Sequence, residues 1–172
     1  MSEYMEDRVG ALEDLEAIRR LRHEWCARLD IALESADAVE AGEAVAWLVD
    51  QLTDDFTQTS NIHDPVSSPQ GFAAFVQAIA GNCEMSFHML SNDLIEFPPG
   101  RHSASGGWYT MAMLTIQGRA LWASCLSEEK YRKRGGRWYV TALSLDYRLV
   151  SPYEAGWAEQ RFVEKKLCEL AY

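Results

Sequence analysis

The second half of the chain limits the possible folds most strongly, because after Gly81 it reads as four successive strands. Strand-type patterning covers residues 85–97, 106 or 107 to 116, 119–131 and 138–150. The segments between them contain Pro-Pro-Gly, Gln-Gly and Arg-Gly-Gly-Arg, which are typical of tight turns. Strands that follow one another with such short connections pair antiparallel, since a parallel pair needs a long crossover. The sequence therefore predicts an antiparallel meander.

The first half reads as helices with one short strand among them. Steps of three and four between apolar residues, with turn signals, predict helices over 11–33, 36–52 and 69–80 and a strand over 56–62. Ser68 as N-cap and Pro69 at the first helical position begin the third helix, which Gly81 ends. Residues 1–10 read as a loose acidic lead-in. The Ser-Pro-Tyr-Glu sequence from Ser151 predicts a last helix to the C-terminus.

Bulk composition predicts a single globular domain over residues 1–172, in which 48% of the residues are hydrophobic. The formal net charge of −10 disfavours binding to nucleic acid or to an anionic membrane, because like charges repel. The sequence has neither a membrane-spanning run nor the pattern of a signal peptide at its start. Four scattered cysteines without a Cys-x-x-Cys pair fit reduced thiols, so we expect a cytoplasmic protein.

Two residues from distant parts of the chain form the strongest candidate for catalysis. Asp30 ends the first predicted helix at the edge of its apolar stripe, and His88 lies in a strand-like run. A carboxylate that orients an imidazole makes a general acid/base pair without a metal or a cofactor. Taken singly, a surface aspartate and a core histidine are the alternative interpretations. The sequence has no metal-ligand spacing, phosphate loop or dinucleotide fingerprint, so neither a metal nor a cofactor is predicted.

Three parts of the sequence resemble the SnoaL-like branch of the nuclear transport factor 2-like superfamily. They are residues 17–21 with 29–30, residues 88–92 with 107–109, and residues 136–140 with 152–157. The resemblance implies an α+β fold, an α+β barrel in which N-terminal helices wrap a cone-shaped, curved antiparallel sheet. It implies function less strongly than structure, because this fold carries enzymes, binding proteins and assembly subunits.

Within that superfamily, the chain resembles scytalone dehydratase and the bile-acid 7-alpha-dehydratase at the candidate pair. The resemblance implies that an Asp near the end of the first helix, here Asp30, pairs with a strand His, here His88. Those enzymes carry a pocket tyrosine just before the Asp, where this chain has Trp25. We assign the missing phenol to Tyr109, which alternates with Trp108 so that only one of them faces the interior. The alternative places Trp108 inside and Tyr109 on the surface.

Further residues complete the predicted site. Trp25 is expected to bind substrate. Asn92 lies four residues beyond His88 and is expected either to hydrogen-bond a substrate oxygen or to form a turn. By the same resemblance, Arg148 near the end of the last strand supplies a cation. His63 is interpreted as part of a turn.

These residues and the resemblance predict a cofactor-independent lyase for a hydroxylated aromatic or polycyclic small molecule. The reaction would be dehydration, or carbon–carbon cleavage that releases formaldehyde as in the diarylpropane formaldehyde lyase of this superfamily, and isomerisation is a third use. The alternative is a non-catalytic ligand-binding module, or an assembly protein similar to the small subunit of ring-hydroxylating dioxygenases. We also expect a homodimer or homotrimer, because the exposed face of a curved sheet needs covering.

Overall fold

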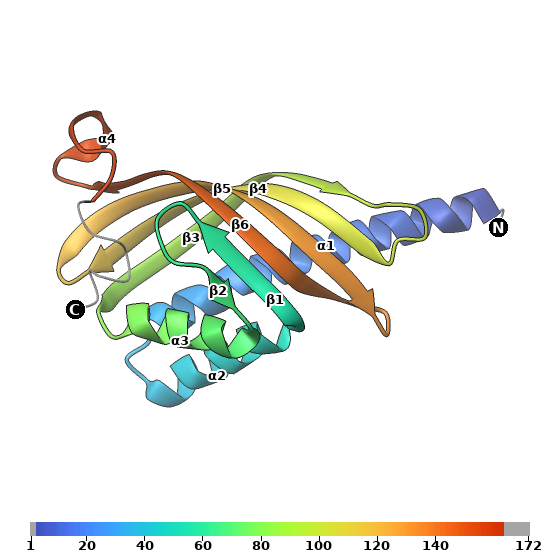
Figure 1. The fold of residues 1–172 in the computed structure, drawn as a ribbon, viewed down its shortest axis with the longest axis horizontal. Helices are drawn as coiled ribbons and strands as arrows, with labels where there is room; N and C mark the ends of the chain where they lie inside the picture. The colour runs from blue at the N-terminus through green and yellow to red at the C-terminus, as the bar shows by residue number, and fades with distance from the viewer. Residues whose placement is uncertain (1–2, 164–172) are drawn as a thin grey trace.

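A long N-terminal helix lies against a curved sheet in the computed structural model, which describes residues 3–163 (Figure 1). The helices are α1 (Glu3–Glu34), α2 (Ala38–Asp50), α3 (Pro69–Ala80) and the short α4 (Gly156–Glu159). The strands are β1 (Leu52–Ser60), β2 (Val66–Ser67), β3 (Cys83–Glu96), β4 (Ser103–Ile116), β5 (Arg119–Arg134) and β6 (Arg137–Pro152). Within the described residues, no helix is both long enough and apolar enough to cross a membrane.

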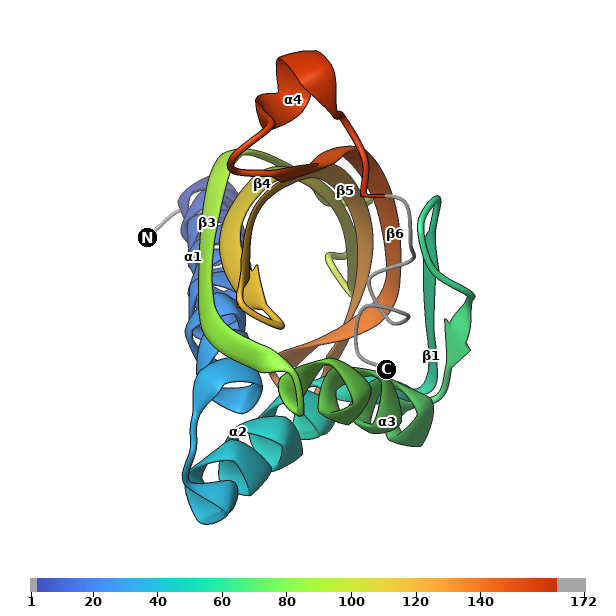
Figure 2. The ribbon, with the colours of Figure 1, turned by 90° about the vertical axis from the view of Figure 1, so that its left-hand side faces the viewer.

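The sheet has the strand order β2-β1-β6-β5-β4-β3. Strands β3 to β6 pair antiparallel in sequence order, which confirms the predicted meander and the α+β fold. Strand β1 instead joins β6 in parallel, so the sheet is mixed rather than wholly antiparallel. Strands β2 to β5 and helix α3 lie between β1 and β6 in the chain, and so long a connection permits the parallel direction. Strands β2 and β3 form the edges, so the sheet is curved but open, where the sequence predicted a cone (Figure 2).

The N-terminal helices form as predicted except at their ends. Helix α1 begins at Glu3, so the prediction of a loose lead-in is wrong for residues 3–10. Arg101, in the turn before β4, contacts the carboxylate of Asp7 and fixes the first turns of α1 to the sheet. In α3 the predicted cap is confirmed, because Ser68 Oγ accepts a hydrogen bond from Gly71 N at 3.1 Å.

Near the C-terminus, strand β6 continues where the sequence predicted the start of a helix. Ser151 and Pro152 pair with Trp122 and Leu121 of β5 and are buried. Strand pairing and burial therefore outweigh the local capping pattern at Ser151. Only the short helix α4 follows, and residues 164–172 of the predicted helix lie outside the described residues.

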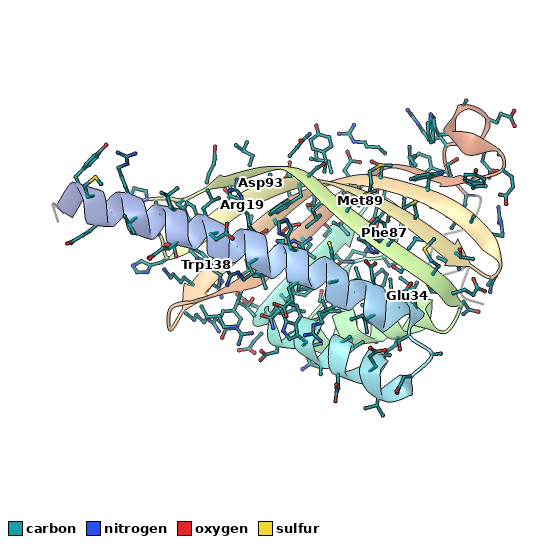
Figure 3. All side chains as sticks on the ribbon, turned by 180° about the vertical axis from the view of Figure 1, so that it is seen from behind. Arg19, Glu34, Phe87, Met89, Asp93 and Trp138 are labelled. Carbon is teal, nitrogen blue, oxygen red and sulfur yellow. The ribbon has the colours of Figure 1, made fainter. Side chains whose placement is uncertain are left out.

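The core lies between the helices and one side of the sheet, which we call the helix-facing side. Ile18, Leu21 and Trp25 on α1 are buried there, as the sequence periodicity predicts. Figure 3 shows α1 beside β3, where Arg19 Nη2 lies 2.8 Å from Asp93 Oδ2. Helices α2 and α3 cover the end of the sheet near β1 (Figure 2). The arrangement brings the C-terminal turns of α1 against the first half of β3.

The opposite side of β3 exposes a row of apolar side chains. Met85, Phe87 and Met89 are between 39% and 46% exposed, and Figure 3 shows Phe87 and Met89 pointing away from α1. Their alternation with Ser86 and His88, which face α1, is the ordinary period of a strand. The homodimer or homotrimer expected from the sequence stays a prediction.

Asp14 fastens the N-terminal half of α1 to the β5–β6 hairpin. Its Oδ1 accepts a hydrogen bond from Trp138 Nε1 at 2.9 Å and lies 2.5 Å from Lys133 Nζ. Burial opposes ionisation of the carboxyl, but these donors outweigh it and hold the pKa of Asp14 below its ordinary value. A buried carboxylate with three basic or donor partners, the third being Arg101, should contribute measurably to stability.

We expect Asp14→Asn to lower the free energy of unfolding by about 1–3 kcal/mol at neutral pH. Because the pKa of Asp14 is lowered in the folded chain, the carboxylate stabilises the fold above the ordinary aspartate pKa of about 3.9. That contribution disappears as the pH falls through the lowered pKa, so urea unfolding of wild type and variant should converge in acid. The control is Asp54→Asn, an exposed carboxylate on β1; equal losses in the two variants at neutral pH would contradict the assignment.

Candidate active site

Asp30 and His88 meet where the last turns of α1 cross β3. The Nδ1 atom of His88 lies 2.6 Å from Asp30 Oδ1. The backbone N–H of His88 donates to Asp30 Oδ2 at 3.1 Å, and the Ser86 hydroxyl donates to Oδ1 at 2.8 Å. The carboxylate therefore accepts from Nδ1–H and leaves Nε2 as the nitrogen with a free lone pair. Among the described residues, none forms a hydrogen bond with Nε2.

The electrostatics of the pair keep the carboxylate charged. Burial opposes ionisation of Asp30, but the hydrogen bonds from His88 and Ser86, together with the charge of His88, outweigh it and lower the pKa of Asp30. The side chains of His88 and Asp30 are only 15% and 16% exposed, so solvent screens their interaction weakly. An ionised Asp30 fixes the ring tautomer of His88 and would stabilise the imidazolium form.

His88 lines a partly open cavity of about 120 Å³. The walls come from α1, α3 and the helix-facing side of β3 to β6, and most of them are apolar, including Trp25, Leu29, Phe72, Phe75, Val76, Ile79, Leu90, Leu114, Leu143 and Leu145. Ligand pockets typically measure ~300–1,000 Å³. The cavity is therefore matched to a compact ligand of about one ring, and a polycyclic molecule would require the walls to move.

Of the other expected site residues, Trp25 lies in the cavity wall and Tyr109 does not. Trp25 is 3% exposed and packs against Phe72 with ring centroids 5.3 Å apart. Tyr109 is 52% exposed on the side of the sheet away from the helices. Trp108, its neighbour, takes the inner position and donates from Nε1 to the Tyr131 hydroxyl at 3.2 Å. The structure therefore corrects the expectation for Tyr109 and supports the alternative that places Trp108 inside.

Asn92 and Arg148 also lie outside the cavity wall. Asn92 is exposed with a φ of 53°, where β3 shifts register between Ser91 and Leu94. Asparagine tolerates this left-handed conformation, so the turn-type role left open by the sequence is the one its backbone fits. Arg148 is 62% exposed and pairs with Asp146. Neither side chain is part of the wall that His88 lines, so the expectation that Arg148 supplies a cation to the site is wrong.

Tyr147, on β6, is the phenol that the cavity does contain. Burial raises the pKa of its hydroxyl, so the group stays protonated. No described residue forms a hydrogen bond with that hydroxyl, which leaves it free to donate to a ligand. Sequence reasoning missed Tyr147, although its position in a strand of alternating apolar residues was visible.

His63 is a second histidine of the cavity wall, and it differs from His88. It lies in the loop predicted from the sequence, but its ring is buried, at 6% exposure. Its Nδ1 lies 2.8 Å from the backbone oxygen of Asp64, and its Nε2 lies 3.2 Å from Gln58 Nε2. Both ring nitrogens of His63 are therefore occupied. Of the two histidines, His88 is the one with a ring nitrogen that is free to act on a ligand.

A buried ion pair borders the cavity and was not predicted. Arg22, which lines the cavity, has its Nε 2.9 Å from Glu129 Oε2, and the two side chains are 6% and 0% exposed. Burial opposes the charge of Arg22, but Glu129 outweighs it and raises the pKa of the guanidinium. The signal in the sequence was the spacing of Arg22, Cys26 and Asp30, which are four residues apart and share one side of α1.

The thiols and possible metal ligands offer no competing chemistry within the described residues. Burial raises the pKa of Cys26 and of Cys125, which both line the cavity, to about 11, so the nucleophilic thiolate is scarce at neutral pH. Cys83 is likewise a free, buried thiol, and Cys168 lies outside the described residues. In residues 3–163, no three His, Cys, Asp or Glu side chains gather in a way that could hold a metal ion.

Comparison with known proteins bears on both fold and family. Residues 10–144 match the SnoaL-like domain family. The hexachlorocyclohexane dehydrochlorinase LinA-type3 from Novosphingobium barchaimii has a similar structure, with a TM-score of 0.71 and 16% identity over 87% of this chain and 95% of that chain. A scytalone dehydratase-like protein from Novosphingobium aromaticivorans has a TM-score of 0.71 and 14% identity over 83% of this chain and 89% of its own. At such identities the likeness shows a shared fold, and no curated protein matches the chain in sequence.

Proposed function

The chain belongs to the family of SnoaL-like domains, and on that premise we propose that it is a cofactor-independent lyase that works by general acid/base catalysis. One observation carries the proposal. The ring of His88 is held through Nδ1 by an ionised Asp30, and its free Nε2 belongs to a residue that lines an apolar cavity. Two fold neighbours are named as a dehydrochlorinase and a scytalone dehydratase-like protein; these names suggest eliminations and support a lyase.

In this proposal His88 moves the proton in both directions. For dehydration, Nε2 takes a proton from a substrate carbon, and the electron pair of the broken C–H bond forms the new double bond. The imidazolium, paired with Asp30, then gives its proton to the departing hydroxyl, which leaves as water. For formaldehyde release, Nε2 takes the proton of a hydroxymethyl O–H, the carbon–carbon bond breaks, and the proton returns to the carbon left behind. Isomerisation would return the proton to a different carbon.

The proposed substrate is a hydroxylated, largely apolar molecule of about one ring. The cavity volume of about 120 Å³ favours that size over the polycyclic substrates also considered from the sequence. The test is to incubate the protein in heavy water with one-ring aromatic and alicyclic alcohols, and to follow deuterium uptake, loss of water and loss of formaldehyde by mass spectrometry. Uptake or elimination that requires the protein supports the proposal. A panel in which no compound exchanges or eliminates contradicts it.

We assign to the Tyr147 hydroxyl, in place of Tyr109, the role of a hydrogen-bond donor to the leaving group. Its raised pKa keeps the proton at neutral pH, and its unpaired hydroxyl can hydrogen-bond the leaving group. We expect Tyr147→Phe to lower kcat by ~10–100-fold, the value of a hydrogen bond to a charged group. The matched control is Tyr109→Phe, which removes the same atom from the exposed side of the sheet and should leave kcat within about twofold. Equal effects of the two substitutions on kcat would remove Tyr147 from the mechanism.

The non-catalytic alternatives fit the site less well. An assembly subunit or a simple binding module was expected to have a filled pocket or to lack the acid/base pair. Residues 3–163 contain an open cavity together with a hydrogen-bonded Asp30–His88 pair, which favours the enzyme.

A further inference from the structure

We propose that Arg22 stabilises negative charge that develops on a substrate oxygen, so that the substrate is a compact carbonyl compound that reacts through an enolate-type oxyanion. This inference rests on the proposed function, because His88 removes the proton whose electron pair the oxygen receives. It goes further in naming the functional group that the substrate carries. It also gives a catalytic role to a residue that was not among those expected from the sequence.

The hydrogen bonding of the Arg22 guanidinium is incomplete. Its Nε forms an ion pair with Glu129 Oε2 at 2.9 Å, but neither Nε nor the buried Nη1 has a well-directed hydrogen-bond partner among the described residues. The Arg22 side chain lines the cavity, and its Cζ lies 5.2 Å from the ring centroid of Trp25. Buried N–H donors are almost always paired in folded proteins, and a charged one especially. An unpaired charged donor beside an apolar cavity therefore points to an acceptor brought by the ligand.

Glu129 is held so that it cannot satisfy the rest of the guanidinium. Its Oε1 accepts a hydrogen bond from Ser127 Oγ at 2.8 Å, and its Oε2 accepts one from the Tyr131 hydroxyl. The Tyr131 hydroxyl in turn accepts a hydrogen bond from Trp108 Nε1. This buried network fixes Glu129 on the Nε side of Arg22. The terminal Nη1 is therefore left for another acceptor.

Charge balance selects a neutral carbonyl over a permanent anion. Arg22 is already matched by Glu129, and an ionised Asp30 is matched only when His88 gains a proton. A carboxylate ligand would therefore add an unmatched negative charge to a low-dielectric cavity. A carbonyl gains its negative charge only as His88 becomes positive, so each new charge has a partner.

His88 Nε2 takes the proton from the carbon next to the carbonyl, the C–H electron pair forms a carbon–carbon double bond, and the carbonyl π pair moves to the oxygen beside Arg22. Collapse of this enolate expels a hydroxyl from the next carbon. That hydroxyl leaves as water with the proton that His88 carries. The hydrogen bonding of the Arg22 guanidinium is most nearly complete at the oxyanion stage, which is where catalysis requires it.

The probe is 4-nitrophenol, a one-ring phenol whose phenolate mimics an enolate oxygen and absorbs visible light. We expect the purified wild-type protein to bind it as the phenolate at a pH where the free compound is largely the phenol. His88→Ala should bind the compound as the neutral phenol, because the proton of the phenol then has no acceptor in the cavity. Activity loss in His88→Ala tests the proposed function separately, so failure of one idea is distinguishable from failure of the other.

The decisive comparison uses the double variant Arg22→Gln/Glu129→Gln, which removes both charges and leaves no unpaired carboxylate. It should bind the phenolate ~10–100-fold more weakly. Glu129→Gln alone keeps Arg22 charged and should retain the phenolate form. If the double variant does not fold, Arg22→Lys carries the test, since it keeps the cation but lacks the terminal nitrogens, and should show the same weakening. A wild type that binds only the neutral phenol or nothing, or a variant at Arg22 that keeps wild-type phenolate affinity, overturns the proposal.

Discussion

Replacing His88 by alanine is expected to lower kcat/KM by ~10²–10⁴-fold, the usual contribution of a positioned general base. The loss should appear with any substrate that the heavy-water screen identifies, since the same nitrogen takes the proton in dehydration, cleavage and isomerisation. The fold should survive, because Asp30 keeps its hydrogen bonds from Ser86 Oγ and from the backbone N–H of residue 88. Circular dichroism and urea unfolding establish that the variant is folded before its kinetics are compared.

Two further variants sharpen that experiment. Asp30→Asn keeps the shape of the site but removes the charge that fixes the His88 tautomer, so it should also lose most activity. His102→Ala is the matched control, because His102 is exposed in the turn before β4 and its side chain forms no hydrogen bond within the described residues. Retention of full activity by His88→Ala would eliminate His88 as the base. A comparable loss in His102→Ala would show that the assay reports stability instead.

Removing only the guanidinium of the buried ion pair should have the largest effect on stability. We expect Arg22→Met to lower the free energy of unfolding by about 3–5 kcal/mol, because it leaves Glu129 buried without its cationic partner. The double variant Arg22→Met/Glu129→Gln should recover part of that loss, since no unpaired charge remains. Urea unfolding of wild type, each single variant and the double variant gives the interaction energy directly.

The matched control for this cycle is Arg28→Met. Arg28 also lies on α1 and pairs with Glu24 at 3.5 Å, but both side chains are at least 40% exposed. Exposed pairs of this kind contribute ~0–1 kcal/mol. Similar losses for Arg22→Met and Arg28→Met, or a double variant no more stable than Arg22→Met, would contradict the view that Glu129 depends on Arg22.

The helices and strands that carry the site could be predicted from the sequence, because local patterns determine them. The apolar steps of α1 and the turn sequences of the meander determine where Asp30 and His88 stand along the chain. The family resemblance then suggested that the two meet. What local patterns do not specify is the side of the sheet that each side chain faces, since a strand reads equally well in either orientation. Tyr109 and Trp108 illustrate this, because both are aromatic and only the tertiary contacts of Trp108, such as its hydrogen bond to Tyr131, distinguish the inner residue from the outer one.

Irregularities in strand register explain why Arg148 and Asn92 lie outside the cavity wall, where the sequence had predicted them to bind substrate. In the pairing of β5 with β6, Ser124 faces Leu149 while Cys125 faces Tyr147, so Arg148 is an extra residue without a partner. This bulge directs Tyr147 into the cavity and Arg148 to solvent, and nothing in the sequence marks it. The shift at Asn92 on β3 is of the same kind. Arg22 was missed for a different reason, since a lone arginine on a helix is ordinarily exposed and its partner Glu129 lies far away in sequence.

The most direct test of the central claim is the tautomer of His88, measured by nitrogen-15 NMR on ring-labelled protein in mildly alkaline solution. His88→Ala assigns the signals. We expect a neutral ring with its proton on Nδ1, hydrogen-bonded to Asp30, and a bare Nε2. In Asp30→Asn this preference should weaken or reverse. A ring that carries its proton on Nε2 in the wild-type protein would have no lone pair to offer the cavity, and would contradict the assignment of His88 as the base.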